Sequence, residues 1–146
     1  DPSQVLGESN VFRYRPCRGI VLRVGVGGAP MVVAQVLLAV RTCGQPLTIS
    51  IDPQEEALWN WLTEELNVFV IAEDEAGLAT RLTITHAYDR LRTIGAVSDQ
   101  LRRAMHEAGI AVIDAPVLAN GRLELRWYLR EQAVSQTMHR YGNLIQ

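Results

Sequence analysis

The sequence predicts an α/β fold in which a mostly parallel sheet is covered on both faces by helices. Short apolar runs with little polar alternation recur along the 146 residues, as in strands that are buried on both faces. Longer segments with helical periodicity and helix-capping residues lie between these runs. Strands and helices that alternate in this way specify parallel strands joined by crossover helices. We therefore expect a single three-layer, Rossmann-like domain over residues 1–146.

The first half of the chain contains three predicted strands and two predicted helices. The strands are expected at residues 19–26, 46–52 and 67–72. The helices are expected at residues 31–43 and 53–66. Pro30 suits the first turn of the first helix, and Gly44 suits the position after its end. Asp52 and Pro53 give the second helix an N-cap and a first residue.

The second half continues the alternation with less regular signals. A short helix is expected at residues 74–82, a strand at 91–94, a helix at 98–109, a strand at 110–116 and a helix at 122–131. Ser98 is the expected N-cap of the helix at 98–109, and Gly109 closes it.

Two segments near the ends alternate apolar and polar residues with a period of two. They cover residues 10–16 and 133–144. A polar face on a strand indicates exposure to solvent, so we expect extended antiparallel ribbon or tail segments that protrude from the buried sheet.

Composition and charge exclude several classes of function. The formal net charge of −2 gives no electrostatic footprint for nucleic acid. The longest apolar stretch, at residues 28–40, is shorter than the roughly 20 residues that a membrane-spanning helix needs. No signal peptide is visible, and the two cysteines have no disulfide or metal spacing, so we expect a cytoplasmic location.

The turn after the first predicted strand is the one candidate for a cofactor site. A dinucleotide fingerprint needs three glycines, and Gly25, Gly27 and Gly28 supply only part of it because Pro30 occupies the third position. A nucleotide-binding module that uses the Gly25–Gly28 turn therefore stays as an alternative. A glycine turn that only passes a strand into a helix is the more economical interpretation.

The sequence offers no clear catalytic or metal-binding residue. Cys43 is expected to pack as a small apolar side chain. Cys17 lies beside Arg15 and Arg18, which could lower the pKa of its thiol, but no base is placed by spacing. The three histidines are too scattered for a metal site, so we expect no catalytic and no metal residues in this chain.

The C-terminal segment is the strongest candidate for a functional surface. Aromatic residues and arginine are enriched at protein interfaces, and the segment ends with both before a Gly-Asn pair. The expected interface or lid residues are Val134, Gln136, Met138, His139, Arg140, Tyr141, Gly142 and Asn143. Packing of the segment on its own domain as an edge strand remains the alternative.

Motifs at both ends of the chain resemble a known family. At the front they are carried by Gly7, Glu8, Ser9, Asn10, Arg13, Arg18 and Gly19. At the back they are carried by Asp114, Ala115, Pro116, Asn120, Gly121, Arg122, Glu124, Leu125, Tyr128, Arg130, Glu131, Gln132, Ser135, His139, Arg140, Tyr141, Gly142 and Asn143. The chain resembles the C-terminal aldehyde-dehydrogenase-superfamily domain of proline utilization A, a bifunctional proline dehydrogenase and L-glutamate γ-semialdehyde dehydrogenase. Residues 25–90 match in pattern only.

The resemblance implies a non-catalytic structural and interaction domain of a proline-catabolic enzyme. The parent enzyme would use NAD for the semialdehyde and, where the two activities are fused, FAD for proline; the domain itself would hold no cofactor. The implied partners are the catalytic domains of the parent chain and a second protomer. The family's terminal segment covers an internal tunnel as a lid, and it corresponds to residues 134–144 here.

Overall fold

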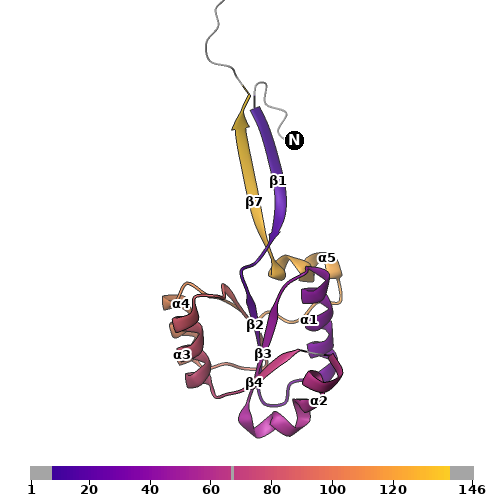
Figure 1. The fold of residues 1–146 in the computed structure, drawn as a ribbon, viewed down its shortest axis with the longest axis vertical. Coiled ribbons are helices and arrows are strands. Elements are labelled where there is room, and N and C mark those ends of the chain that lie inside the picture. The colour runs from indigo at the N-terminus through magenta and orange to yellow at the C-terminus, as the bar shows by residue number, and fades with distance from the viewer. Residues whose placement is uncertain (1–7, 67, 139–146) are drawn as a thin grey trace, which may run out of the picture.

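A computed structural model describes residues 8–66 and 68–138, with the backbone alone described at residues 60 and 63–66. Five parallel strands form the central sheet, in the order β4-β3-β2-β5-β6. They are β2 (Ile20–Val24), β3 (Leu47–Ile51), β4 (Phe69–Ala72), β5 (Arg90–Ile94) and β6 (Ala111–Ile113). Helices cover both faces, which gives the three layers that the sequence predicts (Figure 1).

One face of the sheet packs on α1 (Pro30–Thr42) and α2 (Glu56–Leu66), and α2 follows a short 3₁₀ turn, η1 (Pro53–Glu55). The core on this face contains Ile20, Leu22, Val24, Val36, Val40, Ile49, Trp59 and Leu62. The other face packs on α3 (Glu75–Thr85) and α4 (Asp99–Glu107). The core there contains Val21, Leu78, Leu82, Leu91, Leu101 and Met105. The strand side chains alternate between these two cores, as a sheet buried on both faces requires.

The helix boundaries follow the capping residues closely. The side chain of Asp52 accepts a hydrogen bond from the Gln54 backbone N–H at 3.0 Å, and that of Ser98 accepts from Leu101 at 3.2 Å. Pro30 begins α1, and Gly44 after its end has the left-handed φ of 64° that favours glycine. Asp74 caps α3 through the Gly77 N–H, and α3 runs three residues beyond the predicted end.

The two end segments pair with each other and leave the body of the domain. β1 (Glu8–Pro16) and β7 (Leu129–Thr137) form an antiparallel two-stranded ribbon, with Pro16 opposite Leu129 and Glu8 opposite Thr137. The ribbon rises from the domain beside α5 (Gly121–Glu124), and its far end lies well away from the sheet (Figure 1). The predicted ribbon segments 10–16 and 133–144 are thus confirmed as protruding antiparallel strands as far as Thr137.

The helix predicted at residues 122–131 is wrong in its second half. The helix α5 is followed by a 3₁₀ segment, η2 (Leu125–Tyr128), and β7 already begins at Leu129. Leu129 has an extended backbone, with φ −125° and ψ 155°. Tertiary contacts decide this point, because the buried Tyr128 anchors the turn and the following residues find strand partners in β1.

Candidate functional site: the ribbon and its foot

The ribbon has two faces, both open to solvent. Because opposite residues of an antiparallel pair share a face, Phe12 and Tyr14 lie on one face with Ala133 and Glu131. The exposed fraction is 70% for Phe12 and 60% for Tyr14. The residue directly opposite Phe12 is the small Ala133.

The second face of the ribbon joins an apolar pair to a basic cluster. Val11 lies opposite Val134, and both are exposed. Nearer the domain, the Nε–H of Arg13 donates to the Gln132 side-chain oxygen at 2.7 Å. Arg15 and Arg130 lie directly opposite each other, and the charge of Arg130 is compensated by an ion pair with Asp89.

An isolated two-stranded ribbon is at best marginally stable in water, and each of its outer edges presents unpaired backbone groups. Within the described residues, β1 and β7 pair only with each other. The apolar side chains on both faces are exposed, so none of the described residues covers either face of the ribbon. The exposed backbone edges and apolar faces together make the ribbon suited to a protein partner.

The base of the ribbon, which we call the foot (residues 118–128), is held by arginines of β5. The guanidinium of Arg90 donates to three backbone carbonyls, those of Arg126 at 3.2 Å, Leu129 at 2.7 Å and Trp127. The carbonyls of Arg126 and Trp127 belong to the last turn of η2, where carbonyls run out of donors within the helix, and that of Leu129 begins β7. Arg90 therefore fixes the point where the chain turns from η2 into β7.

A second arginine, Arg92, is fully buried beneath the foot. It pairs with the carboxylate of Glu124 at 3.2 Å and donates to the backbone carbonyls of Ile113 and Ala115 at 3.1 Å and 2.6 Å. The hydroxyl of Tyr128 donates to Glu124 at 2.6 Å. Burial, followed by the hydrogen bond to Glu124, raises the pKa of Tyr128 well above its usual range, so the phenol stays neutral.

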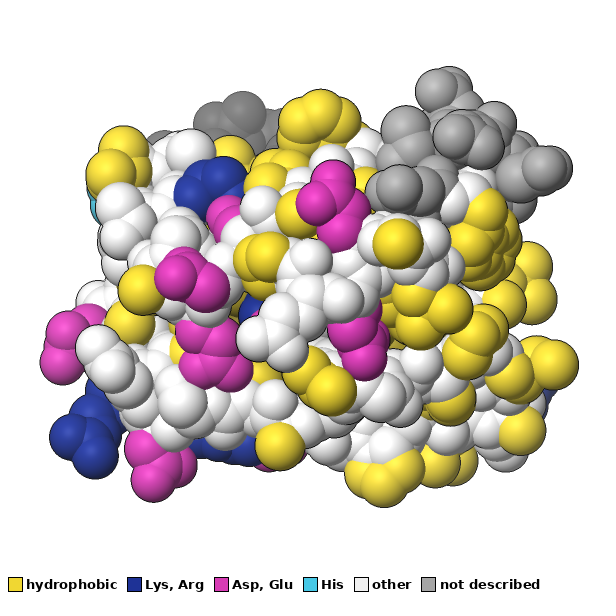
Figure 2. Space-filling model, turned by 90° about the horizontal axis from the view of Figure 1, so that it is seen from below, with side chains coloured by type: hydrophobic (Ala, Val, Ile, Leu, Met, Phe, Trp, Pro, Cys, Tyr) yellow, Lys and Arg dark blue, Asp and Glu magenta, His cyan; other side chains and the backbone are white. Residues whose placement is uncertain are grey.

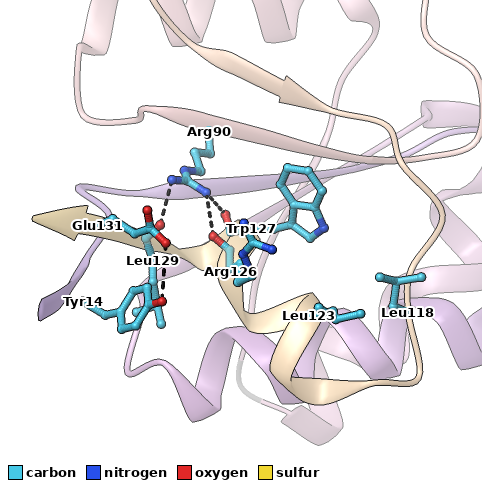
Figure 3. A pocket seen from close by; sticks show the side chains of 8 residues that line it. All are labelled: Tyr14, Arg90, Leu118, Leu123, Arg126, Trp127, Leu129 and Glu131. Carbon is cyan, nitrogen blue, oxygen red and sulfur yellow. Dashed lines mark hydrogen bonds between the residues drawn. The ribbon is translucent and has the colours of Figure 1, made fainter. Parts of the chain in front are cut away.

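A cavity of about 410 Å³ opens between the ribbon and the foot (Figure 3). It is lined by Tyr14, Arg90, Leu118, Leu123, Arg126, Trp127, Leu129 and Glu131, and we call it the foot cavity. A second groove of about 400 Å³ lies between α1 and the foot, and it includes Leu38 and Leu125. Leu118 lines both hollows, so they are neighbours on the surface.

The Gly25–Gly28 turn is already occupied by a carboxylate of the chain itself. The backbone N–H of Gly27 donates to Oε1 of Glu55 at 2.8 Å, and Trp59 donates to the same carboxylate at 3.4 Å. In a dinucleotide site such a backbone N–H faces a phosphate. A side chain added at Gly28 would stand 2.4 Å from Val24 and 3.6 Å from Trp59, so this glycine serves close internal packing.

The arrangement at Glu55 predicts that the chain does not bind NAD. The Glu55 carboxylate would repel the phosphates of NAD. The Gly27 N–H, which would have to donate to a phosphate, already donates to Glu55. Titration calorimetry with millimolar NAD should give only the heat of dilution. A saturable heat would contradict the prediction and restore the nucleotide-binding alternative.

The expected effect of arginines on Cys17 is wrong. The thiol is 4% exposed, and burial raises the pKa of Cys17 more than the nearby positive charge of Arg90 lowers it. Arg15 and Arg18 are not among the charges that act on it. Cys43 is half-buried against the core, as expected, and burial raises its pKa also. Neither thiol has the environment of a nucleophile.

The described part of the chain covers only some of the predicted interface. Val134, Gln136 and Met138 lie along or just beyond β7, and all three are exposed. His139, Arg140, Tyr141, Gly142 and Asn143 lie outside the described residues. The structure adds Phe12 and Tyr14 of β1 and the foot cavity to this candidate interface. The sequence alone did not connect them with the C-terminal segment. The period-two pattern at residues 10–16 is the sequence signal that could have indicated Phe12 and Tyr14.

Within residues 8–66 and 68–138, leaving aside the side chains at 60 and 63–66, no group of three or more metal-ligating side chains comes together. No helix in that part of the chain has both the length and the apolar character to cross a membrane. Comparison of the chain with protein-family models, with curated proteins and with solved structures gives no match.

Proposed function

We propose that this chain is a non-catalytic interaction domain of a proline-catabolic L-glutamate γ-semialdehyde dehydrogenase. In this proposal the α/β body is a scaffold, and the ribbon docks on the catalytic part of the enzyme. The terminal segment after the ribbon then covers a tunnel through which the semialdehyde passes. The resemblance of the end motifs supplies the identity of the enzyme, and the physical features of the ribbon support docking.

The observation that carries the proposal is the uncovered ribbon. Phe12, Tyr14 and Val134 place apolar area in water on both of its faces. Burial of this apolar area against a partner is favourable, by roughly 25 cal/mol for each Å² removed from water. The free backbone edges of β1 and β7 could also pair with an edge strand of the partner, which is a common mode of recognition.

The position of the ribbon's end supports the role of a lid. β7 ends at Thr137, at the end of the ribbon that lies farthest from the sheet (Figure 1). The family-like residues 139–143, which lie outside the described residues, follow this end of the ribbon in the sequence. Covering a tunnel would keep a reactive semialdehyde away from bulk water, without chemistry by any residue of this chain.

Truncation after Met138 tests this proposal, because it removes the terminal segment and leaves the ribbon intact. In the full-length enzyme, coupled conversion of proline to glutamate should slow, and the semialdehyde should appear in the medium. A lag in NADH formation and trapping of the released intermediate with an amine reagent would measure both effects.

The control is the dehydrogenase activity with externally added semialdehyde, which should stay unchanged because the catalytic domains are intact. A truncated enzyme with normal coupled conversion and no released intermediate would refute the role of a lid.

A further inference from the structure

The foot cavity combines an apolar wall with a cation, Arg126, that has no side-chain partner among the described residues. Leu118, Leu123 and Trp127 project from the foot toward the cavity, and Tyr14 and Leu129 close it from the ribbon side (Figure 3). The side chains of Leu118, Leu123 and Trp127 are each more than a third exposed, at 42%, 46% and 37%. The cavity is thus a shallow apolar hollow, open to a large partner.

The charges around the cavity are not equally available. Arg90 is committed to three backbone carbonyls, and Glu131 accepts a hydrogen bond from the Tyr14 hydroxyl at 3.4 Å. Arg126 is exposed, and its guanidinium has no hydrogen-bond or ion-pair partner among the described residues. The group on a partner that suits Arg126 is therefore a carboxylate, because an arginine binds a carboxylate with charge-assisted hydrogen bonds.

The surface around the cavity is too extended for a small molecule alone. Pockets for small ligands usually bury most of the ligand. Here the apolar wall continues on one side into the ribbon face that carries Phe12, and on the other through Leu118 into the groove beside Leu38 of α1. A segment of polypeptide can follow such a path, and its side chains can fill successive hollows.

We infer that the foot cavity docks a protein segment in which a glutamate or aspartate stands between apolar residues, with its carboxylate on Arg126. The inference rests on the proposed function, because it adds a second contact to the docking by the ribbon. It also states the chemistry of the partner, which the ribbon alone does not.

Two probe peptides test the inference on this chain. They are acetyl-Phe-Leu-Glu-Leu-amide and its counterpart with glutamine in place of glutamate. Their binding is followed by the indole N–H resonance of Trp127 in heteronuclear NMR spectra. The glutamate peptide should shift this resonance in a saturable manner and bind about tenfold tighter than the glutamine peptide, which is the effect of one charge-assisted contact.

The matched variants are Arg126→Gln and Arg122→Gln. Both residues are exposed arginines of the same short segment, but Arg122 does not line the cavity. The preference for the glutamate peptide should vanish in the first variant and persist in the second. Equal binding of the two peptides by the unmodified chain, or no saturable shift with either, would overturn the inference.

Hydrocinnamate, a small apolar carboxylate, provides a further arm. If it shifts Trp127 and binds as tightly as the glutamate peptide, the cavity is a small-molecule site and the docking inference is wrong. Each of these failures leaves the coupled activity of the enzyme truncated after Met138 untouched, so the inference and the proposed function can fail separately.

Discussion

Replacing Arg92 by alanine should lower the free energy of unfolding by about 3–5 kcal/mol, the range measured when one member of a buried ion pair is removed. Arg92 has no exposed side-chain area, and its partner Glu124 is only 3% exposed. Without the guanidinium, the carboxylate remains buried with the Tyr128 hydroxyl and the Leu118 N–H as its donors. The carbonyls of Ile113 and Ala115 lose a donor as well. Urea denaturation, followed by circular dichroism, measures the loss.

The matched control for this prediction is Arg102→Ala, which removes a surface ion pair. Arg102 lies 2.6 Å from Asp114, and both side chains are largely exposed, at 39% and 51%. Solvent screens such a pair, so the denaturation midpoint should hardly move. A double variant, Arg92→Met with Glu124→Leu, should recover part of the loss because it leaves no unpaired buried charge. Equal effects of Arg92→Ala and Arg102→Ala would show that the buried pair is not a main anchor of the foot.

Replacing Arg90 by alanine should loosen the ribbon while the central sheet stays folded. The substitution removes the donor for the carbonyls of Arg126, Trp127 and Leu129. A hydrogen bond to a charged group contributes roughly 1.5–3 kcal/mol, so local opening should become at least about tenfold more frequent. Trypsin reports this opening, since the bond after Arg13 lies within the ribbon and the bond after Arg15 is protected by Pro16. The fragment cut after Arg13 should appear about tenfold faster than in the unmodified chain.

The control for the ribbon prediction is Arg103→Ala. Arg103 is exposed on α4 and has no hydrogen-bond or ion-pair partner within the described residues. Its removal should leave the rate of cleavage after Arg13 unchanged. If Arg90→Ala also leaves this rate unchanged, the contacts between β1 and β7 alone hold the ribbon in place, and the proposed role of Arg90 is incorrect.

Most of the central domain could be predicted from local signals. Asp52, Ser98 and Pro30 mark helix starts because their side chains or ring geometry act within three residues. The strands 20–24 and 47–51 are mostly apolar because both of their faces are buried, and Arg23, Thr48 and Ser50 are the polar exceptions. Such signals need no knowledge of distant residues, and the three-layer arrangement follows from their order.

The foot and the pairing of the ribbon could not be predicted in this way. The stretch 122–131 carries helix-forming residues throughout, yet distant partners, Arg90 and β1, turn it into a strand at Leu129. Arginines are unusual in a buried strand, so Arg90 and Arg92 were a sequence signal that β5 has polar partners. In the structure both of them bind the foot. The environment of Cys17 also depends on tertiary burial, which outweighs its arginine neighbours in sequence.

The central claim is that a partner covers the ribbon, and hydrogen–deuterium exchange of β1 and β7 tests it most directly. The exchange of these amides is compared between the 146-residue chain alone and the complete enzyme of which we propose it to be a part. We predict that the outward-facing amides of residues 8–16 and 129–137 exchange readily in the chain alone and become strongly protected in the complete enzyme, while those of β2 and β5 are protected in both. Equal exchange of the ribbon in the two proteins would contradict the claim.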